Sequence, residues 1–101
     1  MKKEFLTSGQ LMEAVRRLDY KDQYKVCEAF CQALQEEDLC EGSVMCGRFQ
    51  ESYEEIELSL PESSFVPLHW AVNDMDNALY EMDIYEPGLF MRIAEKLSEV
   101  I

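Results

Sequence analysis

Residues 67–83, PLHWAVNDMDNALYEMD, carry the strongest periodic pattern in the chain. Apolar side chains recur there every three or four positions and fall within about 60° of one line at 100° per residue. They are Leu68, Ala71, Val72, Met75, Ala78, Leu79 and Met82. The spacing predicts a helix with one buried face, and Pro67 suits the first turn of such a helix.

The opposite side of this predicted helix combines aromatic and amide side chains with acidic flanks. The residues opposite the apolar line are Trp70, Asn73, Asn77 and Tyr80. The flanking acids are Asp74 and Glu81 on one side, and Asp76 and Asp83 on the other. Each flanking pair is seven residues apart, which is about 10.5 Å along a helix. The pattern predicts two rows of carboxylates beside an aromatic strip.

The segment before this helix shows the period-two alternation of a strand. Apolar residues at 56, 58 and 60 alternate with Glu55, Glu57 and Ser59, which is typical of a strand with one buried face. An earlier strand near residues 44–49, with a bulge at Gly47 and a turn at 51–52, completes a predicted β-hairpin. In that hairpin Glu55 and Glu57 point to the same face, about 6.6 Å apart.

Helices are predicted on both sides of the hairpin. Thr7 or Ser8 can cap a first helix that runs to about Leu18, and Asp19 can cap a second helix. Residues 35–38, Gln-Glu-Glu-Asp, end the second helix with acids. Acids oppose the helix dipole at that end, so we expect fraying there.

Pro87 opens a last helix that runs to the C-terminus. The sequence therefore predicts an α+β fold with two N-terminal helices, a β-hairpin and two C-terminal helices. We expect residues 1–101 to form a single small acidic domain, because 101 residues match the usual size of one domain.

Charge is strongly segregated along the chain. Ten acids and no Lys or Arg lie between Phe49 and Met91, within a chain of formal net charge −12. A one-signed surface of this kind favours basic partners. Nucleic acid is a poor direct ligand for it, because phosphates require cations. Anionic membranes would repel the chain, and no apolar run reaches the ~20 residues of a transmembrane helix. With no secretory signal apparent, we expect a cytoplasmic protein.

Motifs that carry chemistry are missing from the sequence. It has no Gly-rich phosphate loop and no HExxH motif, so we expect neither an enzyme nor a cofactor. The cysteines are Cys27, Cys31, Cys40 and Cys46, and His69 is the sole histidine. We expect thiols rather than disulfides or a metal site. A domain stabilised by zinc through the four cysteines is the alternative.

Rows of surface carboxylates can imitate a phosphate backbone. We therefore expect a small acidic inhibitor that occupies the basic nucleic-acid-binding surface of a partner protein, such as a nuclease or another nucleic-acid-binding protein, as a nucleic-acid mimic. In size and charge the chain resembles anti-restriction and anti-CRISPR proteins of mobile elements and nuclease-immunity proteins, which is a likeness of physical class alone. The expected contacts are Glu55, Glu57, Trp70, Asp74, Asp76, Tyr80, Glu81 and Asp83, with the two aromatic residues as anchors.

Two alternatives stay open at this level. The chain can instead be an adaptor or assembly subunit that associates through apolar helix faces, for example as a homodimer. Trp70 and Tyr80 can also be buried structural residues, because Trp is highly buried on average. Reversing Asp74, Asp76, Glu81 and Asp83 to Lys is expected to abolish binding to a basic partner without unfolding the chain.

Overall fold

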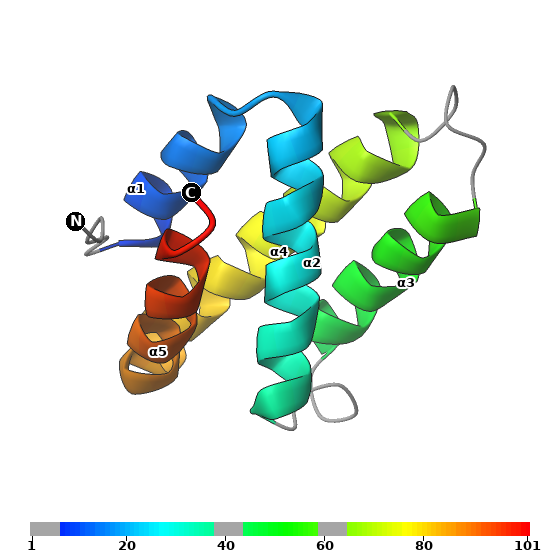
Figure 1. The fold of residues 1–101 in the computed structure, drawn as a ribbon. Helices are drawn as coiled ribbons and strands as arrows, with labels where there is room; N and C mark the ends of the chain where they lie inside the picture. The colour runs from blue at the N-terminus through cyan, green and yellow to red at the C-terminus, as the bar shows by residue number, and fades with distance from the viewer. Residues whose placement is uncertain (1–6, 38–43, 59–64) are drawn as a thin grey trace.

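Helices make up most of the described part of the chain in the computed structural model (Figure 1). The structure describes residues 7–37, 44–58 and 65–101, and for 44–45, 57–58 and 65–67 it describes the backbone alone. The helices are α1 (Ser8–Arg16), α2 (Tyr20–Glu36), α3 (Val44–Leu58), α4 (Phe65–Tyr85) and α5 (Pro87–Ser98). Among them, none combines the length and the hydropathy that a bilayer span requires.

The predicted β-hairpin is wrong, and with it the predicted α+β class. Residues 44–58 form the helix α3, and the described residues contain no strand, so the fold is all-α. Among the described side chains of α3, the buried ones are Cys46, Phe49, Tyr53 and Ile56. Their separations of three and four residues follow a helical period. The alternation after Glu55 reflects only a few residues, and its end at Leu60 lies outside the described part of the chain.

Non-local packing explains why the helix prevails in this segment. The ring of Phe49 meets Phe30 of α2 edge to face, with centroids 4.7 Å apart. Tyr53 stacks between Phe49 and Tyr24, with centroids 6.0 Å from each. On a helix Phe49 and Tyr53 lie on the same side, about 6 Å apart along the axis, which allows their rings to stack at 6.0 Å. In a strand they would also share a face but would lie about 13 Å apart. Gly47 is an ordinary helical position, because a Cβ there would meet nothing within 4 Å.

The predicted helix starts are confirmed by their caps. The hydroxyl of Thr7 accepts a hydrogen bond from the backbone N–H of Gln10 at 3.2 Å. The carboxylate of Asp19 accepts one from the N–H of Asp22 at 2.9 Å. Pro87 stands in the first turn of α5, as expected. The first helix is slightly shorter than predicted, whereas α4 extends the predicted 67–83 helix at both ends.

Helix α4 lies at the centre of the fold and packs against each of the other helices. In Figure 1, α2 crosses in front of α4, and α3 runs antiparallel to α4 as its most extensive partner. Met75 and Leu79 of α4 are fully buried in one core shared by all the helices. The radius of gyration is 12.6 Å, close to the ~13 Å of a compact 100-residue domain. The helices therefore fold around a single core.

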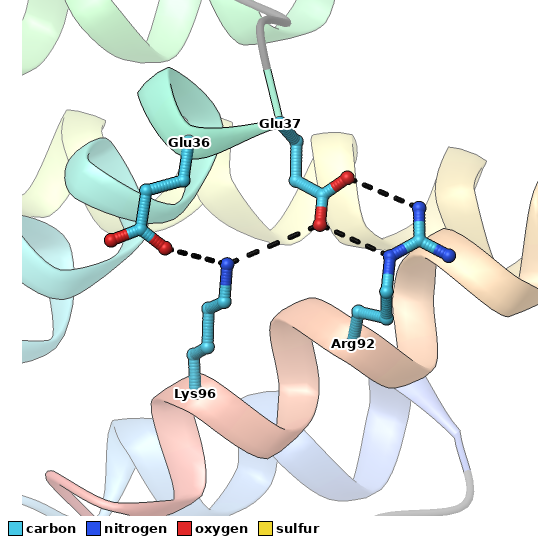
Figure 2. A network of polar contacts seen from close by, with 4 residues as sticks. All are labelled: Glu36, Glu37, Arg92 and Lys96. Atoms are coloured by element: carbon cyan, nitrogen blue, oxygen red, sulfur yellow. Dashed lines mark hydrogen bonds and ion pairs between the residues drawn. The ribbon is translucent and has the colours of Figure 1, made fainter.

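A cluster of ion pairs joins the end of α2 to α5 (Figure 2). Arg92 donates to both carboxylate oxygens of Glu37, at 3.0 and 3.1 Å. Lys96 donates to Glu36 at 2.6 Å and lies 4.0 Å from Glu37. These cations supply the positive charge that the C-terminus of α2 otherwise lacks. The acids that oppose the dipole of α2 are thus paired across to another helix.

Candidate functional site

The outer face of α4 carries an exposed stripe without a charged residue. We call it the outer stripe, and it comprises Trp70, Asn73, Asn77, Tyr80 and Ile84. Its separations of three, four, three and four residues keep the side chains on one side of the helix over about 21 Å. Trp70 is 54 % exposed, Tyr80 60 % and Ile84 51 %. The alternative in which Trp70 and Tyr80 are buried structural residues is therefore wrong.

The flanking aspartates of α4 hold neighbouring helices in place. Asp74 accepts a 2.6 Å hydrogen bond from the hydroxyl of Ser52 on α3. Asp76 forms a 3.0 Å ion pair with Arg16 of α1. Each flank of the helix is thus connected to a different neighbour.

Asp83 has the same kind of role at the start of α1. Its carboxylate accepts a 3.0 Å hydrogen bond from the backbone N–H of Ser8, in the first turn of that helix. A carboxylate in this place satisfies a helix N–H group and suits the helix dipole. Reversal of all four flanking acids to Lys would consequently disturb folding, because three of the four connect α1 or α3 to α4.

The two strand glutamates of the predicted site do not share a face. Glu55 is exposed on α3, and Glu57 also lies in α3, with its side chain outside the described part of the structure. Two residues apart on a helix they are about 200° around the axis, so their predicted 6.6 Å row is wrong. The structure therefore does not extend the carboxylates of α4 with a paired row from residues 55 and 57.

Glu81 differs from the flanking aspartates, because it borders a pocket between α3, α4 and α5. The pocket has a volume of about 350 Å³. Apolar side chains form one part of its wall, namely Cys46, Ala78, Met82 and Leu89. The polar part of the lining consists of Glu81, Tyr85 and Glu86. Tyr85 is 76 % exposed, and the two glutamates are exposed as well.

Several residues of this region were missed by the sequence prediction. Ile84, Tyr85 and Glu86 lie just beyond the predicted end of the helix at Asp83. Ile84 continues the seven-residue spacing of Trp70 and Asn77, and that signal was available in the sequence. The pocket itself had no local signal, because Cys46 reaches it from α3.

Cysteine chemistry is disfavoured at Cys27, whose pKa is strongly displaced. Burial raises the pKa of Cys27 to about 12, so this thiol stays protonated near neutral pH and is a poor nucleophile. His69 is exposed and contacts Trp70, with ring centroids 6.0 Å apart. In the described residues, no three His, Cys, Asp or Glu side chains gather as metal ligands do. Cys40 of the zinc alternative lies outside those residues.

The exposed surface of α3 and α4 thus combines a stripe of aromatic, amide and aliphatic side chains with carboxylates. Of these acids, Asp74, Asp76 and Asp83 bind groups of neighbouring helices, and Glu81 lines the pocket. No family model, no curated protein and no solved structure matches this chain.

Proposed function

We propose that this protein binds a basic partner protein through the outer face of α4 and thereby blocks the nucleic-acid-binding surface of that partner. The outer stripe is the observation that carries the proposal. Exposed Trp70 and Tyr80 are the residue types that dominate protein-binding hot spots. They stand within a pair of helices, α3 and α4, whose one base is Arg48 against eight acids.

The aromatic residues and the carboxylates have different roles in this proposal. The aromatic rings of the stripe supply area that a partner can desolvate. Exposed carboxylates beside it, such as Glu81, attract a basic surface and speed the encounter. Asp74, Asp76 and Asp83 contribute to the field, while their contacts within the chain serve the fold. We expect this encounter in the cytoplasm, and it involves no catalysis by this chain.

A capture experiment at two ionic strengths tests the proposal. Tagged protein is incubated with host lysate at ~0.1 M and ~0.5 M salt, where screening of exposed charges differs strongly. A basic nucleic-acid-binding protein should be retained at low salt and weakened at high salt. Trp70→Ala/Tyr80→Ala should lose it, while Tyr20→Ala, an equally exposed aromatic on α2, should retain it.

The purified partner then provides the decisive assay. The wild-type protein should displace a labelled nucleic acid from that partner in proportion to its own binding. Simultaneous binding of nucleic acid and this protein would refute the inhibitor. Retention of the same partner by the Trp70→Ala/Tyr80→Ala variant would refute the outer stripe as the contact surface.

The spacing of the outer stripe favours one other function, self-association as an assembly subunit. Two α4 helices packed antiparallel about Asn77 would place Trp70 opposite Ile84 of the second copy, with coiled-coil-like separations. The same arrangement brings Glu81 near Asp74 of the other copy. It also brings together two chains that each carry a formal net charge of −12. Like charges oppose this pairing. Sedimentation equilibrium tests it, because a dimer of this kind should strengthen as salt rises.

A further inference from the structure

The pocket between α3, α4 and α5 adjoins the outer stripe. Glu81 and Tyr85 of its lining directly follow Tyr80 and Ile84 of the stripe in the chain. A partner seated on the stripe therefore reaches the pocket without any rearrangement of the helices. The volume of about 350 Å³ lies at the lower end of the 300–1,000 Å³ or so that ligand pockets span.

The carboxylates of this pocket are available for a partner, unlike the aspartates of α4. Within the described residues, neither Glu81 nor Glu86 has a side-chain hydrogen bond or ion pair in the structure. Glu86 occupies the cap position of α5, yet its side chain makes no capping hydrogen bond. Arg92, whose guanidinium pairs with Glu37, also attracts Glu86 through space, whereas Glu81 has no such cation in the described structure. At the edge of an apolar hollow, the charge of the two carboxylates is thus only partly balanced.

The chemistry of the lining selects the occupant. The thioether of Met82 and the side chain of Leu89 offer apolar surface to a methylene stem. The ring of Tyr85 can receive a planar cation on its face, and carboxylates accept hydrogen bonds from guanidinium. A neutral apolar side chain would bring no positive charge to the glutamates, and an acidic one would be repelled. The lining thus complements a long side chain with a cationic end.

We propose that this pocket receives an arginine side chain of the basic partner, with its stem against Met82 and Leu89 and its guanidinium between Glu81 and Glu86. This assignment rests on the proposed function, since the arginine belongs to the partner that docks on the outer stripe. Arginine is preferred to lysine because its planar group can pair with two carboxylates and stack on Tyr85.

A small probe tests the pocket without any protein partner. N-acetyl-arginine methylamide is titrated into the full chain, and the methyl resonances of Met82 and Leu89 are followed by NMR. These resonances should shift and saturate. N-acetyl-citrulline methylamide, which has a similar shape and no charge, should not saturate them. Glu81→Gln/Glu86→Gln should weaken the arginine probe at least tenfold.

A second pair of substitutions controls for overall charge. Glu51→Gln/Glu54→Gln removes the same charge from exposed positions of α3 and should change the affinity for the probe less than twofold. Equal losses in the two double variants would overturn the pocket and leave only diffuse attraction to an acidic surface. Equal binding of the citrulline probe would overturn the role of the cation.

The two proposals fail in different experiments. Saturation of the pocket by the arginine probe, with no basic protein captured by the wild-type chain, supports the pocket and refutes the proposed function. Capture that depends on Trp70 and Tyr80, without any saturation by the arginine probe, supports the proposed function and overturns the arginine pocket. Thermal unfolding of each variant establishes that it is folded under the assay conditions.

Discussion

The two faces of α4 are both rich in large uncharged side chains, but only one of them is covered. On the inner face, Met75 and Leu79 are fully buried among the other helices. On the outer face, Trp70 and Tyr80 are more than half exposed. The inner face stabilises the fold by removing apolar surface from water. The outer face has no covering helix in the described structure, so its aromatic residues are available to another molecule. Hydrophobicity by itself therefore does not distinguish the covered face of this helix from the exposed one.

Truncation on the inner face should have the largest effect. Leu79→Ala removes a fully buried side chain and is expected to lower the free energy of unfolding by about 2–5 kcal/mol. Ile84→Ala on the outer stripe is the matched control and should change it by less than about 0.5 kcal/mol. Urea denaturation followed by circular dichroism measures both. Similar losses in the two variants would mean that the outer stripe is part of a core.

Truncation on the outer face should weaken partner binding and leave the stability nearly unchanged. Trp70→Ala is expected to weaken binding to the captured partner by ~30-fold or more, as hot-spot residues do at about 2 kcal/mol. Its unfolding free energy should stay within about 0.5 kcal/mol of wild type, since surface changes have small effects. Calorimetric titration gives the affinity and denaturation gives the stability. A variant that loses stability but keeps its affinity would show that Trp70 stabilises the fold, as the residues of the inner face do.

The border between the faces should show an intermediate effect on stability. Asp83→Ala removes the acceptor of the Ser8 N–H and should cost about 1 kcal/mol, which is typical of a lost helix cap. Glu81→Gln changes the other type of acid, one without a partner in the described structure, and should leave the unfolding free energy almost unchanged. Equal stability of the two variants would contradict the division between structural and available carboxylates.

The faces of α3 can be tested at Gly47, which has open space around its Cα. Gly47→Ala should raise the unfolding free energy by roughly 0.5–1 kcal/mol, because alanine favours a helix over glycine. In the β-hairpin that the sequence predicted, a bulge at this position would favour glycine and the substitution would destabilise the chain. The sign of the change, measured by denaturation, thus discriminates between the two structures.

The smallest effect is expected at the ion pairs of α2 and α5. The hydrogen bond from Arg92 lowers the pKa of Glu37, so the pair stabilises the folded chain above the ordinary carboxyl pKa of about 4.3. That stabilisation disappears as pH falls through the lowered pKa. Glu37→Gln should therefore lower the Tm slightly at neutral pH and not in strong acid.

Glu28→Gln provides the control for this last prediction. It removes the same charge from an exposed position of α2 that has no described contact with Arg92. Its Tm should change less at neutral pH than that of the Glu37 variant. A Glu37 variant whose Tm deficit persists unchanged in strong acid would show that the ion pair is not its cause.

Local patterns predicted part of this molecule well. The apolar line of residues 67–83 is buried, and Thr7, Asp19 and Pro87 begin helices as expected. These features depend on neighbours a few residues away in the chain. The segment 44–58 was wrongly predicted because a short alternation near Ile56 resembles a strand, while the one-turn spacing of Phe49 and Tyr53 fits a helix. The contact of Phe49 with Phe30 of α2 forms only when this helix packs against α2.

The candidate site shows the same division. The aromatic residues on the far side of α4 and the acids on its flanks followed from helical spacing alone. Whether the aromatic rings were covered did not follow, because coverage depends on where the other helices pack. The engagement of Asp83 also escaped prediction, since its partner Ser8 is 75 positions away in the chain.

The sequence by itself determined the segregation of charge, the helix starts and the buried line of α4, because these properties reside in composition and short-range spacing. Tertiary structure alone decided that residues 44–58 form a helix, that the outer stripe stays exposed, and that three aspartates bind neighbouring helices while Glu81 and Glu86 border a pocket. Those outcomes depend on contacts between distant parts of the chain, which are formed only when the helices pack around a common core.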